Sequence, residues 1–83
     1  TSMSTAWDEA LALVDEACAI EERKERLEDH LAAIEMDLDC YPGDLDLTDR
    51  RTHVVAQLAE LDSRLSQIDR EIENIWVEET QDA

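Results

Sequence analysis

The chain contains almost none of the residues that interrupt helices, since its 83 residues include one Gly and one Pro. A single Gly excludes a glycine-rich loop for phosphate and a backbone nest for an oxyanion. No Ser/His/Asp or Cys/His arrangement with a plausible geometry is present either. The sequence therefore predicts a helical protein that is not an enzyme and needs no cofactor.

Basic residues are also scarce: seven Lys and Arg stand against 23 Asp and Glu, for a net charge of −16. Proteins bind a phosphate backbone by neutralising it with Lys and Arg, so we expect no direct binding to nucleic acid and none to anionic membranes. No apolar run approaches a membrane span, and no signal-peptide pattern is visible. We expect a cytoplasmic protein, with Thr1 and Ser2 as a cloning remnant before Met3.

The few cysteines and histidines suggest no disulfide and no metal site. Cys18 and Cys40 fall on one expected helix, roughly 33 Å apart, whereas a disulfide needs Cα atoms within about 7 Å. We expect Cys18 to be buried beside the apolar face and Cys40 to lie at the turn. His30 and His53 occupy outward positions of different helices without a second ligand at metal-binding spacing, which predicts surface histidines.

Both halves of the chain carry an apolar 3-4 repeat, and the only Pro and Gly lie between them. The repeat positions are Ala10, Leu13, Ala17, Ile20, Lys24, Leu27, Leu31, Ile34, Leu38 and Tyr41, followed by Val54, Leu58, Leu61, Leu65, Ile68, Ile72 and Ile75. Such a repeat keeps one seam of each helix against a partner. We predict an all-α, antiparallel two-helix coiled-coil hairpin, with helices at about 5–40 and 48–79 and a turn at 41–47. Asp46 and Thr48 are both candidates for the cap of the second helix.

Docking the two repeats in an antiparallel register gives apolar pairs along the seam but like charges along one edge. Glu16 falls beside Glu71, and Arg23 falls beside Arg64. Self-sufficient hairpins usually alternate charges at flanking positions, so this edge favours a contact with another chain through Arg23 and Arg64. The alternative interpretation is a solvated edge whose weak repulsion is screened by salt.

The open end of the hairpin carries a second apolar stripe. The same register places Trp7 beside Trp76, and Leu11, Val14 and Cys18 continue from Trp7 at 4-3-4 spacing. This apolar face is wider than two helices can cover, and exposed apolar patches tend to mark interfaces. Trp7, Leu11, Val14 and Trp76 are therefore predicted to bind a partner. Alternatively, the two rings close the end of the hairpin by stacking.

These features together predict a hairpin that pairs with a second copy into a four-helix bundle and acts as an interaction or adaptor module for another protein. An alternative function follows from charge density, because two such rods side by side approach the charge spacing of duplex DNA. This favours a DNA-mimicking inhibitor of the phage type, acting on a nuclease, a repressor or a CRISPR effector. Adaptation to high salt would also explain the acidic excess without any partner.

Carboxylates cluster around the expected turn, at Asp37, Asp39, Asp44, Asp46 and Asp49. An antiparallel hairpin with an acidic tip resembles, in architecture alone, the transcription-factor hairpins that enter the secondary channel of RNA polymerase. This resemblance implies a second alternative, an acidic-tipped hairpin that acts on RNA polymerase. The ordinary interpretation is that these Asp residues cap the second helix and populate the turn.

Overall fold

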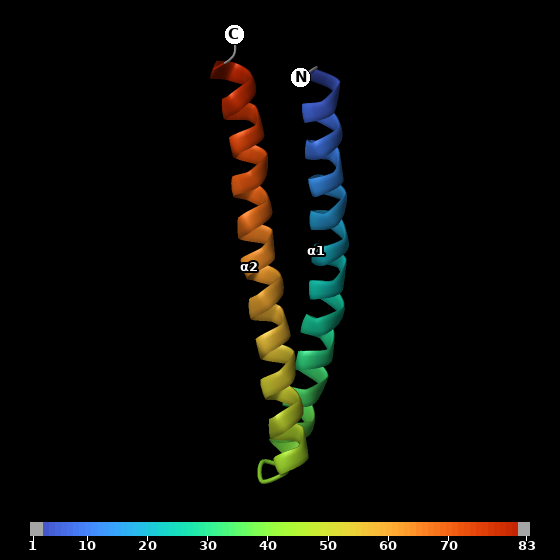
Figure 1. The fold of residues 1–83 in the computed structure, drawn as a ribbon. Coiled ribbons are helices and arrows are strands. Elements are labelled where there is room, and N and C mark those ends of the chain that lie inside the picture. The colour runs from blue at the N-terminus through green and yellow to red at the C-terminus, as the bar shows by residue number, and fades with distance from the viewer. Residues whose placement is uncertain (1–2, 82–83) are drawn as a thin grey trace.

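The computed structural model describes residues 3–81, which form two long helices that run in opposite directions (Figure 1). Helix α1 spans Met3–Cys40 and helix α2 spans Leu45–Gln81. They make a rod 61 Å long and 16 by 13 Å across. The predicted all-α hairpin is confirmed. The expected cloning remnant lies outside the described residues.

The turn between the helices is shorter than the sequence predicted. Tyr41 N–H donates to the carbonyl of Asp37 at 2.9 Å, and Asp44 N–H donates to the carbonyl of Tyr41 at 3.1 Å. Pro42 and Gly43 are thus the central residues of a β-turn, and Gly43 does not adopt a positive φ. This combination fits a type I turn, in which Pro favours the first central position. The turn therefore requires no glycine for its backbone conformation.

Helix α2 is capped by Asp44, which corrects the predicted start at residue 48 and the predicted cap at Asp46 or Thr48. Oδ1 of Asp44 accepts the N–H groups of Asp46 at 3.0 Å and Leu47 at 3.2 Å. The tight turn brings this carboxylate to the first free N–H groups of the helix. Asp46 then lies in the first turn of α2 and pairs with Arg50 at 3.0 Å. The Thr48 hydroxyl donates to the carbonyl of Asp44 at 3.1 Å.

The turn end of the hairpin holds a closed hydrophobic core. Its buried residues are Ile34, Leu38 and Val54, and the partly buried side chains packed against them are Leu27, Leu31, Leu47 and Leu58. Ile34 exposes only 3% of its surface. The core ends at Leu38, because Tyr41, the last predicted seam position of the first repeat, is 67% exposed. Large aliphatic side chains from both helices fill this part of the seam.

The helices separate toward the open end, where both termini lie (Figure 1). Here α1 contributes Ala10 and Ala17 to the seam, where the turn end has leucines and isoleucines. Ala10 is buried, but Leu13 and Ile75 are only half-buried. Ile68 of α2 is also fully buried. The seam is therefore packed beyond its middle, and it borders open space at Leu13 and Ile75.

Candidate interaction surface at the open end

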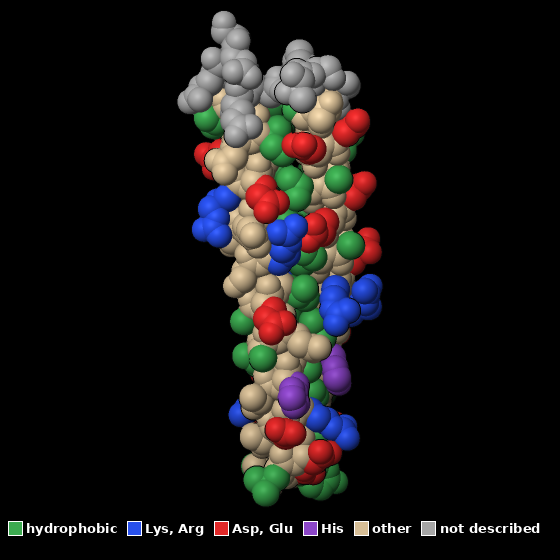
Figure 2. All heavy atoms as spheres, in the orientation of Figure 1, with side chains coloured by type: hydrophobic (Ala, Val, Ile, Leu, Met, Phe, Trp, Pro, Cys, Tyr) green, Lys and Arg blue, Asp and Glu red, His purple; other side chains and the backbone are tan. Residues whose placement is uncertain are grey.

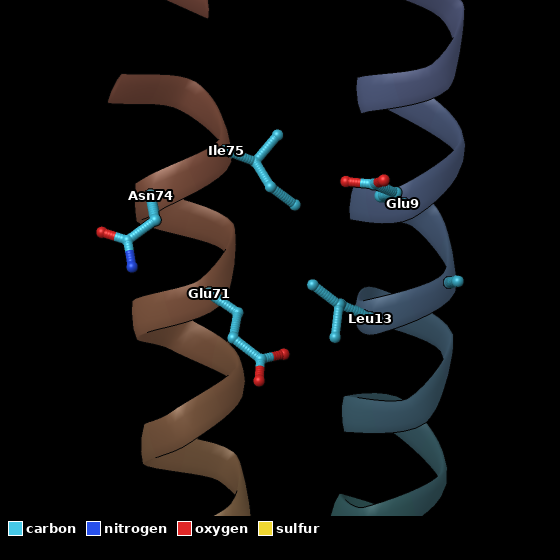
Figure 3. A pocket seen from close by; sticks show the side chains of 6 residues that line it. Glu9, Leu13, Glu71, Asn74 and Ile75 are labelled. Carbon is cyan, nitrogen blue, oxygen red and sulfur yellow. The ribbon is translucent and has the colours of Figure 1, made fainter. Parts of the chain in front are cut away.

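An apolar groove separates the two helices near the open end. It has a volume of about 480 Å³ and is lined by Glu9, Ala12, Leu13, Glu71, Asn74 and Ile75. Figure 3 shows Leu13 and Ile75 pointing toward each other from opposite helices. Glu9 and Glu71 bring carboxylates to its sides. The groove is thus an unfilled stretch of the seam with an acidic border.

The two tryptophans lie together at this end of the rod, as the register predicted. The ring centroids of Trp7 and Trp76 are 5.2 Å apart and the planes meet at 80°, which is an edge-to-face contact. Aromatic pairs favour this geometry because the positive edge of one ring meets the negative face of the other. Trp7 is nevertheless 50% exposed and Trp76 38% exposed. The rings contact each other, and each remains partly exposed.

The apolar residues beside Trp7 form an outward stripe along α1, defined here as Trp7, Leu11, Val14 and Cys18. Leu11 is 52% exposed and Val14 is 44% exposed. Cys18 is also exposed, so its predicted burial is wrong. The stripe is exposed along most of its length, and Trp7 at its start contacts Trp76 of α2. Figure 2 shows apolar side chains at the surface of the open half of the rod.

Arg64 joins the two helices on the edge that the register assigned to like charges. Its Nε lies 2.5 Å from Oε2 of Glu16, and its Nη2 lies 2.7 Å from Oε1 of the same carboxylate. Its Nη1 is also 3.5 Å from Glu71. Hydrogen bonding by Arg64 lowers the pKa of Glu16, and the same contact raises the pKa of Arg64. One guanidinium thus bridges the two acids that the register brings side by side.

Arg64, predicted as a residue that binds a partner, is engaged within the chain, while Arg23 has no ion pair among the described residues. A second interhelical ion pair joins Lys24 Nζ to Asp62 at 2.5 Å. Hydrogen bonding to Asp62 raises the pKa of Lys24. Lys24 and Arg64 thus each join α1 to α2 near the middle of the rod.

The predicted acidic tip is exposed, and three of its five carboxylates make local contacts. Asp44 caps α2, Asp46 pairs with Arg50, and Asp49 lies 3.9 Å from His53. The carboxylates of Asp37 and Asp39 make no such contact in the part of the chain that the structure describes. Within that part, no group of three or more His, Cys, Asp or Glu side chains could hold a metal ion. These contacts fit the ordinary interpretation, a structural role in the turn.

Apolar side chains at the tip were missed by the sequence reasoning. Leu45 is 83% exposed, and Met36 and Tyr41 are also largely exposed. Figure 2 shows apolar side chains at the turn end of the rod. The signal available in the sequence was that Met36 and Leu45 fall outside the 3-4 repeat. The tip is thus mixed in character, with apolar groups among the carboxylates.

Comparison of the chain with protein-family models, curated proteins and solved structures finds no match. Neither helix, over its described residues, has a stretch apolar enough to cross a membrane.

Proposed function

We propose that this protein is a non-enzymatic interaction module whose open end associates with a second copy, forming a four-helix dimer that serves as an adaptor for another protein. The observation that carries the proposal is the half-exposed pair of Trp7 and Trp76 beside Leu11 and Val14, at the end where the seam is open. Burying apolar surface contributes about 25 cal/mol per Å², and tryptophans are enriched among residues that dominate binding.

The groove at the open end also favours packing of additional helices there. Leu13 and Ile75 face a groove that α1 and α2 do not fill, while the turn end of the same seam is closed. Helical bundles bury such apolar faces against additional helices. In a reducing cytoplasm the exposed Cys18 and Cys40 stay as thiols, so association is non-covalent.

Replacing both tryptophans, Trp7→Ala with Trp76→Ala, tests this function. We expect the double variant to keep most of its helix content by circular dichroism and to lose association by light scattering. Tyr41→Ala is the matched control, because Tyr41 is an exposed aromatic residue at the other end of the rod. If the double variant unfolds and associates normally up to unfolding, the tryptophans belong to the core and the proposal fails.

A DNA-mimicking inhibitor is the second candidate, supported by a net charge of −16 on a rod 61 Å long. Dividing 61 Å by 16 gives one net negative charge per 3.8 Å, against about one per 1.7 Å for duplex DNA. The salt dependence of binding distinguishes the two candidates, because it has the opposite sign in each case. Self-association between acidic chains strengthens as salt screens their repulsion, whereas binding of a mimic to a basic target weakens steeply.

A further inference from the structure

The groove at the open end lies on a different edge of the rod from the tryptophan pair. Each residue turns an α-helix by about 100°, so Glu9 and Ala12 lie about 160° and 140° around α1 from Trp7. Both line the groove, whereas Trp7 contacts Trp76. A partner in the groove and a partner on the tryptophans therefore meet different edges of the rod.

The interior of the groove is apolar and short. Leu13 and Ile75 point toward each other across it, and both are half-buried (Figure 3). Ala12 is exposed, and its small side chain leaves the α1 side of the groove open. On each helix the lining residues span about 6 Å, close to one helical turn. This length accommodates about one or two apolar side chains of a partner.

The charged side chains that border the groove are acidic. Figure 3 shows the carboxylates of Glu9 and Glu71 directed into the space between the helices. Helix α1 has no Lys or Arg before Arg23, and Glu9 has no ion pair among the side chains that the structure describes. Next to the groove, Arg64 donates to Glu16 at 2.7 Å and lies 3.5 Å from Glu71. This border complements a cation, whereas the same edge of a second copy would bring further carboxylates.

The surroundings of the groove favour a helix over an extended segment. The backbone groups of α1 and α2 are hydrogen-bonded within the helices at this level, so an extended chain finds no sheet edge to pair with. A helix satisfies its own backbone groups and needs only side-chain contacts. A third helix packs against two others at about 8–10 Å between axes.

We infer that the groove binds a basic amphipathic helix of another protein. Apolar side chains of that helix pack on Leu13 and Ile75. An Arg or Lys three or four positions away, on the same face of the partner helix, pairs with Glu9 or Glu71. The inference rests on the proposed adaptor role and names the chemistry of the partner.

Titration of the full chain against dye-labelled synthetic peptides of about 21 residues, followed by fluorescence anisotropy, tests the inference. The first peptide carries a leucine stripe at helical spacing bordered by arginines. The second has the same composition in scrambled order, and the third has Glu in place of Arg. We expect the first to bind at least about tenfold more tightly than the second, and the third not to bind. Equal binding of the first two shows general attraction to an acidic chain and overturns the inference.

A pair of alanine variants locates the binding in the groove. Ala12→Gln places a longer polar side chain at the groove and removes no buried contact. Ala33→Gln is the matched control, because Ala33 is exposed at the same heptad position about 32 Å further along α1. Ala12→Gln should weaken binding of the first peptide roughly tenfold, and Ala33→Gln should leave it unchanged. Equal affinities of the two variants overturn the assignment to the groove.

A pair of double variants tests the acidic border. Glu9→Gln with Glu71→Gln should weaken binding about fivefold at low salt and flatten its salt dependence. Asp37→Asn with Asp39→Asn removes the same charge at the other end of the rod and should have little effect, because salt screens charges at that distance. Equal weakening by both pairs overturns the predicted contact of the partner's cation with the groove.

Light scattering of the chain without peptide separates this inference from the proposed self-association. A dimer that does not bind the first peptide overturns the inference alone. A monomer that binds the peptide supports the inference and overturns the four-helix dimer. The double variant Trp7→Ala with Trp76→Ala should still bind the peptide, because the tryptophans lie on the other edge. Loss of peptide binding by this variant, with its helix content intact, contradicts the assignment of two separate edges.

Discussion

The two ends of this hairpin follow the same 3-4 repeat but differ in how completely they pack. At the turn end, Ile34, Leu38 and Val54 are buried. At the open end, Leu13 and Ile75 border a groove and the tryptophans stay half exposed. A heptad pattern states which face of a helix is apolar, but side-chain volume decides whether a single partner helix covers it. The two helices alone close the turn end, whereas the open end leaves apolar side chains exposed.

Truncating an isoleucine at each end gives the largest expected contrast. Ile34→Ala should lower the free energy of unfolding by about 3 kcal/mol, because it empties a buried site. Ile75→Ala should cost about half as much in dilute protein, since that side chain already borders open space. Urea unfolding followed by circular dichroism measures both variants. Equal losses would show that the two ends are packed alike.

Removing the cap of α2 tests how the turn end is stabilised without changing its hydrophobic core. Asp44→Ala should lower the free energy of unfolding by about 1 kcal/mol, because two N–H groups lose their acceptor. Asp39→Ala is the control, with the same carboxylate removed from an exposed position. Thermal unfolding compares them. A loss of equal size in both variants would assign the effect to charge and not to capping.

The pH dependence of Glu16 tests the interhelical ion pair near the middle of the rod. Its lowered pKa means that the pair stabilises the folded chain above the unperturbed value of 4.5 and that this stabilisation is lost as the pH falls through the folded pKa. The stability gap between the native chain and Glu16→Gln should therefore be largest near neutral pH and close in acid. Glu22→Gln, which removes one carboxylate at an exposed position, is the control. A Glu16→Gln gap that stays constant down to acid would contradict the pairing with Arg64.

The smallest expected effect is at the turn. Gly43→Ala should leave the fold unchanged and raise the free energy of unfolding by roughly 0.4 to 1 kcal/mol, because alanine restricts the unfolded chain. The structure allows this, since φ at Gly43 is not positive and an added Cβ meets nothing within 4 Å. Chemical denaturation measures the change. A clear loss of stability would mean that the turn needs a left-handed residue.

Sequence periodicity predicted the hairpin and the contact of Trp7 with Trp76, because apolar spacing encodes which face of each helix meets the other. It did not predict the cap at Asp44, which depends on how tightly the chain turns at Pro42 and Gly43. It also failed for Cys18, since an apolar neighbourhood in sequence does not guarantee a covering helix in space.

The electrostatic contacts were predicted least well. A register that pairs flanking positions at the same level sets Glu16 beside Glu71 with no cation between them. A long guanidinium stem reaches beyond its own level, and Arg64 therefore contacts both carboxylates. How far such a side chain reaches depends on the folded structure, and the pairing of facing positions in the register does not predict it.

Amide hydrogen exchange at dilute and at concentrated protein tests the central claim most directly, that the open end is completed by a second copy. Peptides from the turn end, around Ile34 and Val54, should be protected equally at both concentrations. Peptides covering residues 7–18 should gain protection only in the concentrated sample, as association buries the outward stripe. Protection of residues 7–18 that does not change with concentration would contradict the account.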